Sequence, residues 1–243
     1  MKDYKKYIIA LGLLTVSFSY IFISTDTGVA RIFVNLLTFA GIYGLAAIGI
    51  NVHFGWTGLL NFGHAAFMGI GAYTTILLIP HALGREGVVV ETGLPLPLAV
   101  IIGMLAAALL GLVLGLPTLR LRGDYLAIVT IAAAEIFRLL IRDFEDITGG
   151  VYGVIQFSDA LQNLRPNFIT NLANKIEVSS SQLWVGVITW TLIIFTLLFL
   201  NRLQKSPWGR ALRAVREDED AVRALGKNAV WLKLQSFMLG ASI

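Results

Sequence analysis

Residues 206–226 read SPWGRALRAVREDEDAVRALG, and this charged segment lies between two strongly apolar ones. Ser206 followed by Pro207 predicts a helix start, because the hydroxyl caps free N–H groups and proline suits the first turn. Apolar residues then recur at helical spacing, with arginines between them. The acidic run 217–220 favours a second helix start, and Gly226 suits the end of that helix. We therefore expect two short amphipathic helices in sequence.

The rest of the chain has the composition of a membrane protein. Its 243 residues are 56% hydrophobic and only 14% charged, with a mean hydropathy of +0.76, whereas soluble domains carry about 25% charged residues. The chain has no cysteine, which excludes disulfides and cysteine-based metal sites or nucleophiles. We expect an all-α fold, a polytopic bundle of about six full transmembrane helices plus the start of a seventh. Hydropathy places these helices at about 7–24, 30–52, 58–80, 94–116, 124–142 and 182–201, with the seventh beginning near 229.

The two ends of the chain each raise a question. The basic start and the apolar run that follows are typical of an uncleaved first membrane helix, or alternatively of a signal peptide cleaved near residue 30. At the other end the sequence stops at Ile243, inside an apolar run that is too short to span. We expect 1–243 to be a single transmembrane domain that is truncated at its carboxyl end.

Basic residues predict the orientation, because short cytoplasmic loops are enriched in Lys and Arg. They are frequent before the first helix, at 120–122 and at 202–228, and sparser in the segments between. This asymmetry predicts a cytoplasmic amino terminus, with 143–181 outside and 202–228 inside. The basic charge then faces anionic lipid headgroups or partner proteins, and nothing beside it indicates nucleic-acid binding.

The cytoplasmic segment 202–228 has two interpretations. An amphipathic helix can rest on lipid, but four consecutive acidic residues at 217–220 are unfavourable beside an anionic leaflet. Docking of the helices into a groove of a cytoplasmic protein explains both the apolar face and the mixed charge. We favour the docked partner.

Small residues form a stripe in the helix expected at 94–116. Gly103, Ala107, Gly111 and Gly115 are spaced four apart and therefore share one face, which lets another backbone approach closely. We interpret the stripe as a helix-packing surface, with a directly lined substrate path as the alternative.

The stretch 55–73, GWTGLLNFGHAAFMGIGAY, places polar residues in an apolar helix. Asn61 and His64 are three apart on the face of one expected helix, and Thr57 lies a turn earlier. They predict either interhelical hydrogen bonds or a polar patch on a translocation path; a metal site is not expected, since no acidic residue is adjacent. Glycines at 58 and 63 would permit a broken helix start, whose free N–H groups attract carboxylates.

Glu135 is the clearest ionisable residue within an expected span. Arg138 lies three residues later, so the two side chains share a face and can pair. The pair either orders the bundle or lines a polar path near a substrate entrance.

Three runs together resemble the permeases of ABC importers for branched-chain amino acids. The run DAVRALG, from Asp220 to Gly226, is similar to their E-A-A-x-x-x-G coupling motif, with Asp in place of Glu and Val222 in place of the second Ala. The other two runs are the stretch 55–73 and LRLRGDYLAIVTIAAAEIFRLL with TGGVYG after it. The resemblance covers most of 35–243.

The resemblance implies an ABC importer permease fold and a transport subunit that is not itself an enzyme. The resemblance implies that 202–228 is the coupling loop, which contacts the ATP-binding subunits. The residues expected to make these contacts are Trp208, Arg210, Leu212, Asp220, Ala221 and Gly226. The polar residues within the expected spans, Asn61, His64, Thr57 and Glu135, are our candidates for the substrate path. The implied location is the bacterial inner membrane. The implied partners are a homologous second permease, two ATP-binding subunits that hold ATP and magnesium, an amino-acid-binding protein outside, and lipid.

The substrate stays open at this point. Branched-chain or other neutral amino acids come first, and urea or short amides are the alternative for the same type of permease. An ion-coupled secondary transporter is the alternative from a different class, and it would need charged residues at mid-membrane and inverted repeats. No phosphate-binding loop is present in the sequence, so ATP binding by this chain is not expected.

Overall fold

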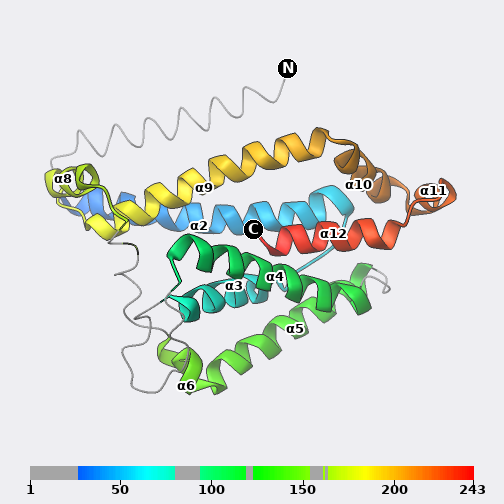
Figure 1. The fold of residues 1–243 in the computed structure, drawn as a ribbon, viewed down its shortest axis with the longest axis horizontal. Coiled ribbons are helices and arrows are strands. Elements are labelled where there is room, and N and C mark those ends of the chain that lie inside the picture. Colours follow the sequence, from blue (N-terminus) through cyan, green and yellow to red (C-terminus); the bar gives the residue numbers. More distant parts are fainter. Residues whose placement is uncertain (1–26, 80–93, 119–122, 154–160, 162–163) are drawn as a thin grey trace. The chain divides into compact units, whose positions relative to one another are not determined.

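A computed structural model describes residues 27–79, 94–118, 123–153, 161 and 164–243. Within these ranges the chain is helical and contains no strand, which confirms the all-α prediction (Figure 1). The expected first helix at 7–24 lies outside the described residues. The elements are α2 Thr27–Thr57, α3 His64–Leu78, α4 Leu96–Thr118, α5 Gly123–Asp143, α6 Glu145–Thr148, the 3-10 turn η1 Gly150–Tyr152, α8 Asn167–Lys175, α9 Ser180–Lys205, α10 Pro207–Glu217, α11 Glu219–Ala224 and α12 Ala229–Ala241.

Three of the described helices are long and apolar enough to cross a membrane. They are α2 over 30 residues from Gly28, α4 over 23 and α9 over 26, and each exceeds the roughly 20 residues that a bilayer requires. The chain is therefore a multi-pass membrane protein. The expected span at 124–142 is observed as the 21-residue helix α5, which is not among these three. The total of six spans stays a prediction.

The stretch expected as a helix at 58–80 departs from the prediction. Residues 58–63 are not helical, and α3 begins only at His64 and has 15 residues. Gly58 adopts a positive φ of 72°, which a residue with a Cβ rarely adopts. The prediction of a continuous helix from 58 is therefore wrong, and the broken start that the glycines permit is what occurs. At about 1.5 Å per residue, α3 is too short to cross the apolar layer by itself.

The described residues form two compact units, and α2 and α9 contribute to both. The described part of the first unit comprises residues 27–42, 161 and 164–192. Its core is formed by Ala30, Val34 and Val178. The indole of Trp190 donates a hydrogen bond to the carbonyl of Leu37 over 3.1 Å, and this bond ties α9 to α2.

The described part of the second unit comprises residues 43–79, 94–118, 123–153 and 193–243. In it α4 packs along α3 and α12 (teal, green and red in Figure 1). The stripe on α4 is buried, as predicted. A Cβ on Gly103 would lie 2.7 Å from the carbonyl oxygen of Gly71 in α3, and one on Gly111 would lie 3.1 Å from the Cβ of Ala241 in α12. The stripe therefore permits close backbone contact with two different helices.

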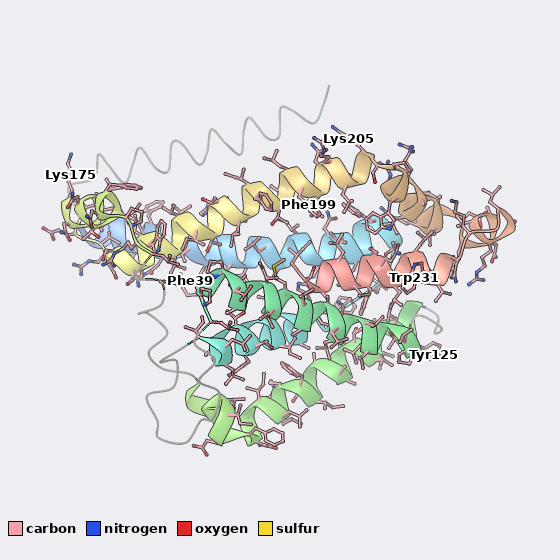
Figure 2. All side chains as sticks on the ribbon, viewed as in Figure 1. Phe39, Tyr125, Lys175, Phe199, Lys205 and Trp231 are labelled. Carbon is pink, nitrogen blue, oxygen red and sulfur yellow. The ribbon has the colours of Figure 1, made fainter. Side chains whose placement is uncertain are left out.

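Aromatic and aliphatic side chains fill the centre of the second unit. Phe67 of α3 and Phe237 of α12 are fully buried and meet edge to face, with ring centroids 5.5 Å apart. On the outside, Phe199 and Trp231 (labelled in Figure 2) keep 49% and 52% of their surface exposed. Exposed apolar side chains of this size suit lipid or neighbouring helices as their environment.

Candidate functional site

Two polar regions of the second unit are candidates for function. The first is the imidazole cluster, which we define as His53, Asn61 and His64, at the break between α2 and α3. The second is the pair of loop helices α10 and α11. Both regions are built from residues that the sequence singled out, but the structure groups these residues differently.

The break between α2 and α3 is held by its own backbone. Gly58 donates from its amide to the carbonyl of Phe54 over 3.0 Å, and Leu59 donates to the carbonyl of His53 over 3.1 Å. Asn61 then accepts a hydrogen bond at Oδ1 from the amide of Gly63 over 3.0 Å. These bonds give partners to the amides of Gly58, Leu59 and Gly63, which the interrupted helix would otherwise leave unsatisfied.

Asn61 also helps to fix the tautomer of His53. Because Oδ1 of Asn61 is occupied as an acceptor, its Nδ2 is the atom that donates to Nδ1 of His53, over 2.9 Å. The other ring nitrogen, Nε2, lies 2.8 Å from the carbonyl oxygen of Phe237, which only accepts. His53 therefore carries its proton on Nε2 and connects the break to α12 through two hydrogen bonds.

His64 is buried without any such partner. Only 4% of its surface is exposed, and neither ring nitrogen has a hydrogen-bond partner among the described residues. Its ring meets that of His53 edge to face, with centroids 5.8 Å apart. A Cβ on Gly49 would lie 2.7 Å from Cε1 of His64 and 2.8 Å from the carbonyl oxygen of Gly240. Gly49 of α2 thus leaves the space that the His64 ring occupies, and Gly240 of α12, where a Cβ would collide with Nε2 of His53, leaves space for the His53 ring.

Unsatisfied buried polar atoms are costly, so His64 is the most unusual polar residue of the described chain. Nothing in its surroundings uses its donor or its acceptor. A group that supplied both a donor and an acceptor would satisfy this ring.

Thr57 joins the cluster only indirectly. Its hydroxyl donates to the carbonyl of His53 over 2.8 Å, within α2, and only 3% of the residue is exposed. The expectation that Thr57, Asn61 and His64 share the face of one helix is wrong, because Thr57 ends α2 and Asn61 lies in the break. The non-helical residues 58–63 separate Thr57 from His64, and Thr57 is linked to the cluster through the carbonyl of His53.

Glu135 pairs with Arg138, as the spacing predicted. The two side chains form a two-pronged ion pair, with nitrogen to oxygen distances of 2.6 and 2.9 Å. More than half of each side chain is exposed within this chain, and neither residue contacts the imidazole cluster. Glu135 therefore lies apart from Asn61, His64 and Thr57, with which the sequence analysis had grouped it.

The candidate residues taken from the sequence did not include His53, although it is the centre of the network. The available signal was its spacing of four residues from Thr57, which places both on one face of α2. The contribution of Phe237 could not be found in this way. Its carbonyl comes from a helix 184 residues further along the chain.

The loop helices begin and end as the sequence predicted. Ser206 caps α10 and accepts from the amide of Gly209 over 3.2 Å, and Pro207 follows it at the first position. Asp218 caps α11 and accepts from the amide of Ala221 over 2.9 Å. The α11 helix ends in a Schellman motif, in which Gly226 has a φ of 75°. The acidic run therefore marks the boundary between the two helices.

One side of α10 is attached to the rest of the unit. Leu212 is fully buried against Val52 and Trp56 of α2. The indole of Trp208 donates to Oε1 of Gln235 in α12 over 2.7 Å and meets Trp56 edge to face. Trp208 and Leu212 thus point into their own chain rather than toward a partner.

The α11 helix is held onto α12. Val222 packs in a small core with Val215 and Ala229. Glu219 forms ion pairs with Arg223, at 2.7 Å, and with Lys233 of α12. These contacts fix the orientation of a helix of only six residues, which would not be stable alone.

The opposite side of α10 and α11 is free to meet another molecule. Leu225 keeps 81% of its surface exposed, and the side chain of Asp220 keeps 92%. Arg210, Ala221 and Gly226 are also exposed. We call Arg210, Asp220, Ala221, Leu225 and Gly226 the loop face.

The two candidate regions are connected by one side chain. Arg216, in the last turn of α10, donates from its NH1 nitrogen to the carbonyl oxygen of Gly55 over 2.6 Å. Gly55 lies in the last turn of α2, directly before the break and two residues after His53. The loop helices and the imidazole cluster therefore share the end of α2.

Comparison with known proteins agrees with the grouping that these motifs predicted. The family described as branched-chain amino acid transport system, permease component, matches residues 32–243. The chain is 36% identical to the high-affinity branched-chain amino acid transport system permease protein LivM of Escherichia coli K12, over 98% of this chain and 55% of that protein.

Further relatives show the same pattern. The LivM protein of Salmonella typhimurium is 34% identical over the same shares. The permease protein LivH of Escherichia coli K12 is 24% identical over 86% of this chain and 66% of that protein. The chain spans about half the length of the LivM proteins it matches. No solved structure gives a significant match.

Proposed function

The chain belongs to the family of branched-chain amino acid transport permease components, and we propose that it acts as a permease subunit of an ABC importer for branched-chain or other neutral amino acids. The observation that carries this proposal is the loop face. It lies on two capped helices that are anchored to α2 and α12 by their other side. ATP hydrolysis is assigned to separate subunits, so this chain is a transport component and not an enzyme.

We propose that an ATP-binding subunit docks on the loop face. The residues named from the coupling motif divide into two groups. Arg210, Asp220, Ala221 and Gly226 are exposed and would make the contact, whereas Trp208 and Leu212 would hold the helices in place. Leu225 was not among the residues named from the motif. It is the large exposed apolar side chain of the loop face, and it can insert into a groove of the ATP-binding subunit.

A movement of α10 can be transmitted directly to the break between α2 and α3. The Arg216 contact joins α10 to Gly55, and Gly58 follows three residues later, where α2 has ended. A displacement of α10 would therefore pull on the end of α2 and change the packing of His53 against Phe237 of α12. We propose this as the link between closure of the ATP-binding subunits and rearrangement of the helices.

The imidazole cluster is our candidate for the substrate path. His64 has an unused donor and an unused acceptor, and a movement of α12 away from α2 and α3 would expose both to a passing amino acid. Asn61 contributes by fixing His53, while the hydroxyl of Thr57 is already bonded within its helix. Glu135 lies apart, and we assign it to the surface that faces a neighbouring helix or subunit.

The proposed topology has a cytoplasmic amino terminus, with the loop helices inside and 143–181 outside. It requires the non-helical residues 58–63 and α3 together to carry the chain across the membrane, since α3 alone is too short. Arg31 at the start of α2 donates to the carbonyl of Glu177, at the end of α8, over 2.9 Å. This bond supports the prediction that both residues lie on the same side of the membrane, here the outer one. An amino-acid-binding protein would deliver substrate to that side.

A second permease is proposed as the partner within the membrane. Escherichia coli K12 has two proteins similar to this chain, and their names place both in a high-affinity branched-chain amino acid transport system. A pair of homologous permeases would supply two loop faces, one for each of two ATP-binding subunits. The ATP-binding subunits would bind ATP and magnesium, and lipid would surround the exposed apolar helices of the permeases.

The test is to purify the full-length protein with the subunits encoded beside it. We expect a stable complex with an ATPase and ATP-dependent uptake of L-leucine into proteoliposomes. Uptake that follows an ion gradient without any ATPase would instead identify an ion-coupled transporter. ATP-dependent uptake of urea or a short amide, with none of leucine, would correct the substrate class and keep the mechanism.

A further inference from the structure

A polar hollow of about 670 Å³ lies in the first unit, where the start of α2 meets the end of α8 and the start of α9. Its volume is in the range of small-molecule sites, about 300–1,000 Å³. The hollow carries charges of both signs, from Arg31 and Glu177, together with the amides of Asn35, Asn174 and Gln182.

Glu177 occupies an unusual backbone position in this hollow. Its φ of 51° makes it the one residue other than glycine with a positive φ in the described part of the chain. Val178 donates to the carbonyl of Ala173 over 3.0 Å, and Glu177 donates to that of Asn174 over 3.4 Å. These two bonds define a Schellman motif at the end of α8.

This motif normally places glycine where Glu177 lies, as α11 does with Gly226. Glutamate is disfavoured there, since its Cβ crowds the backbone. Strained backbone of this kind concentrates at functional sites. The choice of a charged residue at a position suited to glycine indicates that the carboxylate itself has a use.

Arg31 is oriented by the same residue. Its Nε donates to the carbonyl oxygen of Glu177, so the two terminal nitrogens of the guanidinium remain to bind a ligand. Among the described residues no ion pair involves Arg31 or the carboxylate of Glu177. Within the described part of the chain, the hollow therefore presents one oriented cation and one anion, neither of them in an ion pair with a side chain.

We infer that this hollow binds a free α-amino acid in its zwitterionic form. The guanidinium of Arg31 would bind the carboxylate in two-pronged fashion, and the carboxylate of Glu177 would bind the ammonium group. Ala173 and Val178 supply apolar lining at the base, against which an aliphatic side chain packs. The inference rests on the proposed function, because it takes the substrate class from there and places a reception site on the outer side.

The alternative occupant is a loop of the binding protein. A docked protein would be expected to meet a flat, broad surface, whereas the paired charges here lie in a hollow of small-molecule size. We therefore favour the free amino acid and make protein docking an outcome of the test.

The test measures equilibrium binding of radiolabelled L-leucine to the full-length protein in detergent, without the binding protein. Two analogues each lack one charge: 4-methylpentanoate has only the carboxylate, and 3-methylbutylamine only the ammonium group. Glu177→Gly removes one carboxylate while it retains the backbone carbonyl and favours the observed φ. Arg31→Gln removes the cation. Lys175→Gln, an exposed neighbour outside the lining, is the matched control.

We expect Glu177→Gly to weaken leucine binding about tenfold or more, because a charged hydrogen bond is lost, and to leave binding of 4-methylpentanoate unchanged. Arg31→Gln should weaken both, and Lys175→Gln neither. Unchanged leucine affinity in Glu177→Gly, or no binding to the wild type, overturns the inference. If Glu177→Gly and Arg31→Gln weaken binding of the binding protein but not of leucine, the inference is overturned and the hollow is a docking surface.

Leucine uptake by the assembled wild-type transporter is measured in the same preparation. Intact ATP-dependent uptake without binding at the hollow removes only this inference. Loss of uptake in the wild type removes the proposed function instead. Glu177→Asn, which tolerates a positive φ and carries no charge, replaces Glu177→Gly if that variant is poorly folded.

Discussion

Arg216 of α10 holds the carbonyl oxygen of Gly55 at 2.6 Å, and this single hydrogen bond joins the loop helices to the end of α2. Gly55 precedes the helix break, and a carbonyl in the last turn of a helix has no intrahelical partner. A charged donor at this position satisfies the carbonyl and matches the helix dipole. The contact therefore stabilises the end of α2 and also connects it to whatever moves α10.

Removal of this contact should uncouple ATP hydrolysis from transport. In Arg216→Gln we expect the complex to assemble and hydrolyse ATP, while leucine uptake falls about tenfold, because one charged hydrogen bond is lost. The ratio of uptake to hydrolysis in proteoliposomes measures the effect. Arg213→Gln is the matched control, since the hydrogen bond of Arg213 within the described residues goes to the carbonyl of Gln204 and not to α2. Equal ratios in both variants would exclude the proposed link.

Gly49 should tolerate no side chain. In Gly49→Ala the new Cβ would lie 2.7 Å from the buried ring of His64, and overpacking of this kind destabilises proteins by about 1–3 kcal/mol. Thermal unfolding of the purified protein should show the loss. Gly44→Ala on the same helix meets only the end of the Ile193 side chain, at 3.4 Å, and serves as the control. Similar unfolding temperatures for both variants would contradict the packing of His64 against α2.

Leu212 and Leu225 should behave as opposites. Leu212 is fully buried, so Leu212→Ala leaves a cavity and should destabilise the protein by about 2–5 kcal/mol. Leu225 is 81% exposed, so Leu225→Ala should leave unfolding unchanged and weaken association with the ATP-binding subunit. Thermal melts and co-purification separate the two effects. The account fails here if Leu225→Ala leaves the complex as stable as the wild type.

Gly226 should be replaceable only at a cost in backbone energy. Its φ of 75° strains any residue with a Cβ, by about 1–2 kcal/mol, although nothing lies within 4 Å of the site that a Cβ would take. Gly226→Asn should therefore be milder than Gly226→Val, because asparagine tolerates this conformation better. Leucine uptake measured for both variants checks the order. Equal loss of uptake in both would indicate a lack of space rather than backbone strain.

The sequence predicted those features that depend on neighbouring residues. Ser206, Asp218 and Gly226 bound α10 and α11 as expected, because capping is decided within a few residues. The pairing of Glu135 with Arg138 followed from their spacing alone. The long apolar helices α2, α4 and α9 were predicted within a few residues at each end.

The rest depends on contacts between distant residues. The break at 58–63 is stabilised by the hydrogen bond between Asn61 and His53. His53 is held in turn by the carbonyl of Phe237 in α12, which is distant in the sequence. The burial of Leu212 could not be predicted either, since the amphipathic pattern of α10 does not say which side meets its own chain. The motif placed Leu212 among the residues that contact a partner, and the structure places Leu225 on the exposed side instead.

The central claim is that the loop face receives an ATP-binding subunit. Residues 1–243 contain no cysteine, so within them Ala221→Cys gives one site for crosslinking, on the exposed side of α11. We predict that this variant of the full-length protein crosslinks to the ATP-binding subunit in assembled membranes, with a yield that changes when ATP is added. Leu212→Cys, on the buried side, should not crosslink. A transporter that takes up leucine with ATP and never crosslinks through Ala221→Cys would contradict the account.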